Sequence, residues 1–204
     1  MKTDLVKELD SYQARRGDVR LVVVPSRRYL MVDGHGDPNV SEEYAAALAV
    51  LYPLAYGLKF LSKRELERDY VVPPLEGLWW AEDMATFTTS RDKSAWDWTM
   101  MLLVPGWLTP EHVRAARESV AAKKPEIDLD SVRHGELDEG LCVQTLHVGP
   151  FDTEGPVLAD LHERFIPDNG LVMRGKHHEI YLSDARRTAP EKLRTILRQP
   201  VARI

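Results

Sequence analysis

The chain repeats one order of predicted elements, and this repeat constrains its fold more than any other sequence feature. Residues 29–36 (YLMVDGHG) predict a strand and a turn, followed by an apolar helix and strands around GLWW. Thr86–Thr89 and Ala95–Val104 then predict a hairpin. Residues 143–149 (VQTLHVG) begin the same order about 110 residues later. Since each half alone is small for a stable core, two halves that pair edge to edge predict an α+β fold with one antiparallel-rich sheet.

The repeat also predicts the division of the chain and the place of a ligand. Both long helices would cover one face of the sheet, and the other face would form a shallow ligand cleft. Residues 1–18 are polar and of mixed charge, so they are expected to form an N-terminal arm before a single domain at 19–204. The parts of that domain are a first module at about 19–108, a linking helix at about 109–124 and a second module at about 128–204.

All five tryptophans of the chain fall between Trp79 and Trp107. Because side chains alternate along a strand, Trp96 and Trp98 are expected on one face, while Trp79 and Trp80 point to opposite faces. Such rings would form a wall that binds flat or cationic ligands. The alternative is that they fill the core, which is the commoner role of a single tryptophan. Which rings line a cleft stays open, and Trp107 is the weakest candidate.

The same alternation separates two sets of side chains along residues 177–182. His177, Glu179 and Tyr181 share one face, and the intervening His178 and Ile180 share the other. The second set suits packing against the helices, so the first set is expected to point into the cleft. A carboxylate there could hold a cation, or take a proton from water if burial raises its pKa. The alternative is a half-exposed strand with ordinary polar residues.

Composition and motifs exclude several other classes. The formal net charge of −5 gives no footprint for nucleic acid. No apolar run reaches the roughly 18 residues of a membrane helix, and the N-terminus lacks the apolar segment of a signal peptide, so a cytoplasmic protein is expected. No metal or cofactor is expected, because the adjacent His177 and His178 would point apart and no glycine-rich nucleotide loop occurs. The lone Cys142 is expected to be a buried core residue. The oligomeric state stays open.

Four stretches of the chain resemble one known family. They look like the GyrI-like, or gyrase-inhibitor-like, small-molecule-binding family in residues 31–39 (MVDGHGDPN), 74–80 (PLEGLWW), 143–155 (VQTLHVGPFDTEG) and above all 177–198 (HHEIYLSDARRTAPEKLRTILR). The resemblance extends over roughly 18–200. It points to the stand-alone branch of the family rather than to the domain fused to a DNA-binding module.

The resemblance implies a fold and two functions. The family fold is a tandem pair of strand–helix–strand–strand (SHS2) modules with a ligand cleft between them. In fused relatives, which are multidrug-responsive regulators, a glutamate and aromatic rings bind lipophilic cations, and Glu179 matches that kind of position. The stand-alone branch includes cyclopropanoid cyclopropyl hydrolases, which open the strained ring of DNA-alkylating natural products of the yatakemycin and duocarmycin type. The chain departs from the family at Ala185, where proline is usual.

A cofactor-free hydrolase that detoxifies cyclopropanoids is therefore the first hypothesis. Glu179 and Tyr181 are its expected catalytic residues, with Glu179 activating a water. The expected ligand-binding residues are Trp79, Trp80, Trp96, Trp98 and His177. The alternative is a non-catalytic protein that sequesters lipophilic cations, with Glu179 as the counter-charge. In both cases the partner is a hydrophobic or cationic aromatic small molecule. A protein-interaction role, such as inhibition of a topoisomerase, has little support beyond the family name.

Overall fold

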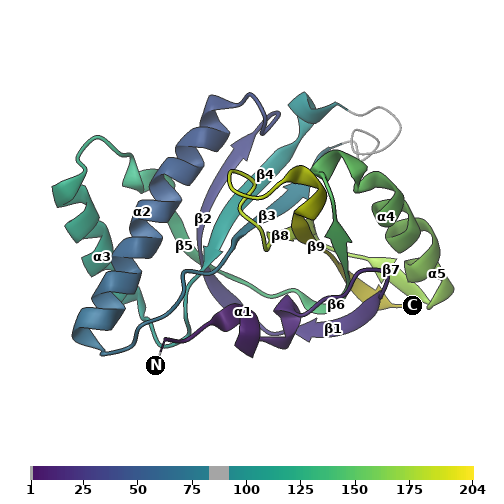
Figure 1. The fold of residues 1–204 in the computed structure, drawn as a ribbon, viewed down its shortest axis with the longest axis horizontal. Helices are drawn as coiled ribbons and strands as arrows, with labels where there is room; N and C mark the ends of the chain where they lie inside the picture. Colours follow the sequence, from purple (N-terminus) through teal and green to yellow (C-terminus); the bar gives the residue numbers. More distant parts are fainter. Residues whose placement is uncertain (1, 83–91) are drawn as a thin grey trace.

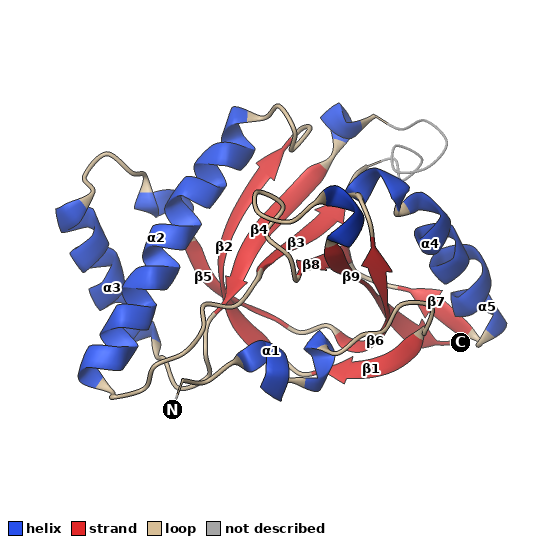
Figure 2. Cartoon of the chain, viewed as in Figure 1, coloured by secondary structure: helices blue, strands red, loops and turns tan. Residues whose placement is uncertain are grey.

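The structure, a computed structural model, describes residues 2–82 and 92–204. These residues form a nine-stranded sheet with helices beside it (Figures 1 and 2). The strands are β1 (Arg20–Val24), β2 (Arg27–His35), β3 (Leu75–Trp80), β4 (Asp97–Leu103), β5 (Arg133–Leu137), β6 (Gly140–Val148), β7 (Leu171–Met173), β8 (His177–Tyr181) and β9 (Arg194–Arg203). The α-helices are α1 (Leu5–Glu8), α2 (Glu42–Glu65), α3 (Pro110–Lys123), α4 (Gly155–Ala159) and α5 (Ile166–Asp168). The π-helical η6 (Asp160–Phe165) joins α4 to α5, and single turns are η1 (Asp10–Tyr12), η3 (Lys93–Ala95), η4 (Leu129–Ser131), η5 (Phe151–Thr153) and η7 (Pro190–Lys192).

The order of the strands shows two similar units side by side in one sheet. Neighbouring strands follow the order β1-β6-β9-β8-β3-β4-β2-β5, and β7 pairs with β9. All of these ladders are antiparallel. One unit is β2–α2–β3–β4 with β4 in its middle, and the other is β6–α4–β8–β9 with β9 in its middle. The ladder between β3 and β8 joins them. The α+β class, the antiparallel-rich sheet and the repeated order of elements are therefore confirmed.

The outer strand of each unit pairs with the other unit. β1 leads into β2 but pairs with β6, and β5 leads into β6 but pairs with β2. The two ladders keep one register through the bends, with Val24 opposite Gly140 and Arg27 opposite Leu137. Pro25 stands at the first bend, where its missing N–H interrupts no ladder. Gly140, at the second bend, has φ 62°, a conformation that favours glycine.

Most of the candidate residues lie on the face that α2 also covers, and this corrects the expectation that they would point away from the long helices. Trp98, Trp79 and His177 stand side by side across β4, β3 and β8. The ring of Tyr44 on α2 packs edge-on against Trp98, and the ring of His162 on η6 packs edge-on against His177. Helical segments of both units therefore stand on this face, which is called the front face below. Figure 1 shows α2 and α4 on either side of β3 and β8.

The N-terminal arm covers the opposite face of the sheet, called the back face below. Leu5 and Tyr12 of the arm pack in one buried cluster with Ile180 and Ile196. Ile180 therefore packs against the short helical segments of the arm and not, as was expected for it, against the long helices. Alternation separates the two faces of a strand, but it does not say which of two covering layers each face meets.

Buried charges join the arm to both units on the back face. Five side chains, each no more than 3% exposed, form the back-face network: Tyr12, Glu76, Glu139, His178 and Arg198. His178 lies between two carboxylates, with Nδ1 2.9 Å from Oε1 of Glu139 and Nε2 3.0 Å from Oε2 of Glu76. Arg198 pairs with Glu139 at 2.8 Å. Tyr12 donates a hydrogen bond to Glu76, and Arg198 donates one to a backbone carbonyl of the arm.

The network fixes the charges of its own members. Burial by itself would lower the pKa of His178, but the charge of Glu139, the hydrogen bond to Glu139 and the nearby carboxylate of Glu76 raise it above the usual 6.5. Burial would raise the pKa of Glu139, but His178 and Arg198 lower it from 4.5 to about 2. With His178 protonated, two positive charges balance two carboxylates, and buried charges need such a balance.

The long helix α2 is a core helix of the first unit. Ser41 caps it by accepting a hydrogen bond from the backbone N–H of Tyr44. Pro53 lies inside α2 and does not end it. By length and a mean hydropathy of 1.4 the helix could also span a membrane, which the sequence prediction did not anticipate. Its buried side chains, however, pack with β2, β4 and α3. A Cβ at Gly57 would lie 2.9 Å from Val120, so glycine permits the close approach of α3.

Most elements follow the predicted order, with differences at the sheet edges. The linking helix α3 begins with Pro110 after a capping box between Thr109 and His112. The sequence did not predict β5 or β7, because β5 is a largely polar strand and β7 has only three residues. The predicted strand at Thr86–Thr89 lies outside the described residues.

The back-face network predicts how stability depends on pH. A group whose pKa is raised in the folded state stabilises the protein at pH values below its unfolded-state pKa. This stabilisation is lost as the pH rises through the folded-state pKa. The free energy of unfolding should therefore fall above about pH 6.5 through His178, and below about pH 4.5 through Glu139. Urea unfolding between pH 4 and 9 would measure it. His178→Gln should destabilise the protein by about 3–5 kcal/mol near pH 6 and remove the alkaline decline.

The exposed His35 gives the matched control for this experiment. His35→Gln should keep both the stability and the alkaline decline of the unmodified protein. An unchanged alkaline decline in His178→Gln would contradict the assignment of that decline to His178.

Candidate ligand-binding site

The register of the central strands gathers the candidate side chains on the front face. Trp79 on β3 stands between Trp98 on β4 and His177 on β8. In the adjacent row Gly77 stands opposite Glu179. The carboxylate therefore has a neighbour without a side chain on β3, at the ladder where the two units meet.

A chain of hydrogen bonds crosses this ladder and holds the carboxylate. Nε1 of Trp79 donates to Oη of Tyr181 at 3.0 Å, and Tyr181 donates to Oε2 of Glu179 at 2.7 Å. The second carboxylate oxygen, Oε1, lies 3.6 Å from Nε2 of His177, which is too long for a hydrogen bond. The Glu179 side chain is 14% exposed. One oxygen is thus held in place, and the other is not committed to Tyr181.

Burial fixes the protonation of the groups around Glu179. Burial, and then the negative charge of Glu179, raise the pKa of Tyr181 well above its usual value, so its hydroxyl stays a donor. The pKa of Tyr44 on α2 is raised mainly by burial and also by Glu179. Elsewhere, burial raises the pKa of the Cys142 thiol to about 12, so it cannot act as a thiolate nucleophile at neutral pH.

Gly77 is required by the close packing of this site. A Cβ at this position would lie 2.5 Å from Cε of Met100 and 2.8 Å from Nε1 of Trp79. It would also lie 3.1 Å from Oη of Tyr181. Any side chain here would therefore disturb both partners of the hydrogen bond between Trp79 and Tyr181.

Two further rings extend the aromatic surface toward one end of the front face. Trp96 packs edge-on against Trp79 with ring centroids 5.8 Å apart, and Phe151 packs edge-on against Tyr181 at 5.6 Å. Trp96 directly follows η3 of the first unit, and Phe151 begins η5 of the second. Nζ of Lys93 lies 5.8 Å from the centre of the Trp96 ring. Rings from both units therefore stand around the Trp79–Tyr181 pair.

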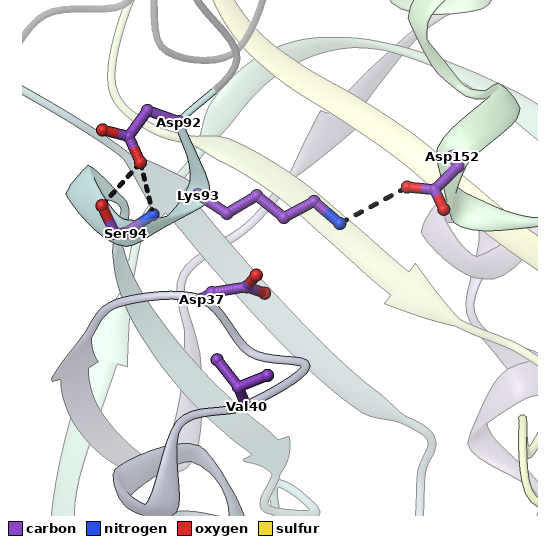
Figure 3. A pocket seen from close by; sticks show the side chains of 6 residues that line it. All are labelled: Asp37, Val40, Asp92, Lys93, Ser94 and Asp152. Atoms are coloured by element: carbon purple, nitrogen blue, oxygen red, sulfur yellow. Dashed lines mark hydrogen bonds and ion pairs between the residues drawn. The ribbon is translucent and has the colours of Figure 1, made fainter.

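A hollow of about 640 Å³ lies at the turns η3 and η5 (Figure 3). It is lined by Asp37, Val40, Asp92, Lys93, Ser94 and Asp152. Nζ of Lys93 lies 3.4 Å from Oδ1 of Asp152, so this ion pair joins η3 to η5. Lys93 also touches the ring of Trp96, and Asp152 is the neighbour of Phe151 in sequence. The hollow thus lies at the edge of the aromatic surface, with a carboxylate-rich lining.

The structure brings together most of the site residues expected from the sequence. Five residues, called the front-face cluster below, contact one another in a continuous series on the front face: Trp79, Trp96, His177, Glu179 and Tyr181. Trp98 adjoins Trp79 but is fully buried under Tyr44 and over Gly34, in the position of a core residue.

The other two tryptophans lie away from the cluster. Trp80 faces the back of the sheet, where the ammonium of Lys176 covers its ring, so its expected place in the same cleft is corrected. Trp107 packs against Tyr70 and donates a hydrogen bond to Ser62 at the end of α2. Alternation already separates Trp79 from Trp80, but only the covering layers show which of the two is on the site's face.

Sequence reasoning missed several neighbours of the site. Gly77 has a signal in the GLWW stretch, since glycine inside a strand marks a close approach of another group. Phe151 and Lys93 lie on single turns with no pattern of their own, and Tyr44 belongs to an apolar helix. Among the residues that the structure describes, no group of three or more His, Cys, Asp or Glu side chains could hold a metal ion.

Comparisons with known proteins place this geometry in a family. The family model described as the GyrI-like small molecule binding domain matches residues 17–202. A crystal structure of an uncharacterized conserved protein from Listeria innocua shares 42% identity and a TM-score of 0.89, covering 98% of this chain and 100% of the other.

Two further crystal structures of proteins described as hydrolases from Listeria innocua are also similar. They share 40% and 41% identity, each with a TM-score of 0.85. The matches cover 98% and 99% of this chain and all of the other chain. No curated protein matched the chain. The family model extends over nearly the whole chain, and the fold agrees with that of full-length relatives, so this protein belongs to the GyrI-like small-molecule-binding family.

Proposed function

We propose that the front-face cluster binds flat, hydrophobic aromatic molecules and hydrolyses the cyclopropane ring of DNA-alkylating cyclopropanoids. The observation that carries this proposal is the carboxylate of Glu179, which Tyr181 holds among aromatic rings at the ladder between the two units. The activity would detoxify such compounds inside the cytoplasm without a cofactor. The family's small-molecule binding, and the hydrolases among its full-length structural relatives, support the proposal.

The rings supply the binding part of this function. Trp79, Trp96, Tyr181 and Phe151 contact one another in series and offer apolar and π surface from both units. Stacking and cation–π contacts contribute about 0.5–2 kcal/mol each. A flat ligand held there would be removed from bulk water, and a strained electrophile would be fixed beside Glu179.

Glu179 supplies the proposed chemistry. It accepts a proton from a water molecule whose oxygen bonds to the methylene carbon of the cyclopropane. The ring carbon–carbon bond breaks, its electron pair enters the conjugated dienone, and the carbonyl oxygen takes up a proton to become a phenol. Water is thereby added across the broken bond. Tyr181 orients the carboxylate through Oε2 and leaves Oε1 for the water.

Binding without chemistry is a second candidate function. The ammonium of Lys93 lies 5.8 Å from the centre of the Trp96 ring, and this contact supports a preference of the aromatic surface for cations. A lipophilic cation could take a similar position with Glu179 as the counter-charge. Recovery of unaltered ligand after long incubation would favour this function over hydrolysis.

Glu179→Gln tests the hydrolytic proposal. The amide keeps the size of the side chain but cannot take a proton from water, so the rate of ring opening should fall by about 10²–10⁴-fold. Product formation from a duocarmycin-type compound, followed by mass spectrometry, measures it. Glu163→Gln, at an exposed carboxylate on η6, is the matched control and should keep full activity. Full activity in Glu179→Gln, or no acceleration over buffer by the unmodified protein, would reject the mechanism.

Gly77→Ala tests whether the close packing beneath the site is needed for binding. The added Cβ would collide with Met100 and Trp79, so ligand affinity should fall by at least tenfold. Titration of the tryptophan fluorescence with an aromatic ligand would measure the loss. Gly106→Ala is the control, because no atom lies within 4 Å of a Cβ at that position. Equal affinity in Gly77→Ala and Gly106→Ala would contradict a ligand position beside Gly77.

A further inference from the structure

Two histidines lie against each other at the second unit's side of the front face. His177 belongs to β8 and is 8% exposed. His162 belongs to η6, the π-helical segment between α4 and α5 (Figure 1). Their rings meet edge-on with centroids 5.8 Å apart. A π-helical segment is rare, and such segments often occur at functional sites.

Three of the four nitrogens of these rings lack hydrogen-bond partners. Nδ1 and Nε2 of His177 and Nε2 of His162 are all buried without a partner among the described residues. Nε2 of His177 comes no closer to Glu179 than 3.6 Å. Buried polar side chains are nearly always hydrogen bonded, so an unpartnered group calls for a specific explanation. A ligand atom that arrives at the front-face cluster would supply the missing partner.

The chemistry of the two rings selects the kind of ligand group. Burial, and then the neighbouring His177, lower the pKa of His162 to about 4, so it is neutral at pH 7. A neutral imidazole presents one N–H donor and one acceptor nitrogen. Such a ring recognises an oxygen atom, either a carbonyl that accepts from N–H or a hydroxyl that can also donate. The described residues contain no cluster that could hold a metal ion, which leaves hydrogen bonding as the role of the pair.

We propose that His162 and His177 form a polar subsite that binds the carbonyl or phenolic oxygen of an aromatic ligand held by the front-face cluster. This inference rests on the proposed ligand-binding function and names the group that the second unit recognises. In ring opening, the oxygen that receives the electron pair of the broken carbon–carbon bond would lie at this subsite. The imidazole N–H groups would then stabilise the negative charge that develops on that oxygen.

A matched pair of probes tests the subsite on the full chain. Fluorenone and fluorene are flat aromatic molecules of the same shape, and only fluorenone carries a carbonyl. The unmodified protein should bind fluorenone about tenfold more tightly than fluorene, as measured by quenching of tryptophan fluorescence. The double variant His162→Phe, His177→Phe keeps the ring shapes without their nitrogens. It should lose this preference while its affinity for fluorene stays within about twofold.

Controls separate recognition from structure. His35→Phe makes the same change at an exposed residue and should keep the preference for fluorenone. His162→Asn keeps a side-chain donor and should retain part of it. Thermal unfolding without ligand should not show a lower Tm for His177→Phe, because the ring nitrogens it removes have no partner in the free protein. If the double variant does not fold, the two single variants provide the same comparison, and each should reduce the preference.

The outcomes distinguish the subsite from the function on which it rests. Equal binding of the two probes by the unmodified protein, or a preference that survives in the histidine variants, would overturn the subsite and leave ligand binding intact. Failure of the unmodified protein to bind either probe would overturn both the subsite and the binding function.

Discussion

The buried ion pairs of the back-face network are the interaction on which the rest of this structure depends. His178, two carboxylates and Arg198 lie almost completely out of water, so each charge needs its partners in place. Glu76 stands on β3 and His178 on β8, the two strands whose ladder joins the units. Arg198, which lies on β9, connects that strand and the arm to the network. The network therefore specifies one register for the sheet, where apolar packing alone would tolerate more than one arrangement.

The same two strands carry the site on their other face. Gly77 and Glu179 directly follow Glu76 and His178 in the two strands, so they point to the opposite face. The charged side chains on the back face therefore fix the position of Glu179 on the front face. The back of the ladder is charged, dry and covered by the arm. Its front carries the aromatic rings and the carboxylate of the front-face cluster. A rigid ladder between two such surfaces explains how the strands themselves can hold a carboxylate among tryptophans.

How much could be predicted from the sequence depends on how far apart in the chain the interacting residues lie. Alternation within β8 places Glu179 and Tyr181 on the same face, because they are two positions apart in the strand. The hydrogen bond from Trp79 to Tyr181 depends on the register between β3 and β8, which no local pattern contains. The choice of face also escapes prediction, since the arm is short, polar and without periodicity, yet it covers the back of the sheet. Arg198 directly follows residues 191–197, whose pattern suits either a turn of helix or a strand.

The exchanged outer strands have a consequence for the synthesis of the chain. β1 is made early, but its partner β6 follows only after the whole first unit and α3. Until then the edge of β1, which carries the exposed Val23, has no strand beside it. The β1–β6 ladder that pairs this edge joins residues more than half the chain apart. Contacts between such distant segments form slowly. During synthesis on the ribosome, the first unit therefore has unpaired strands at both edges until the second unit has been made. Only then can the two units complete one sheet.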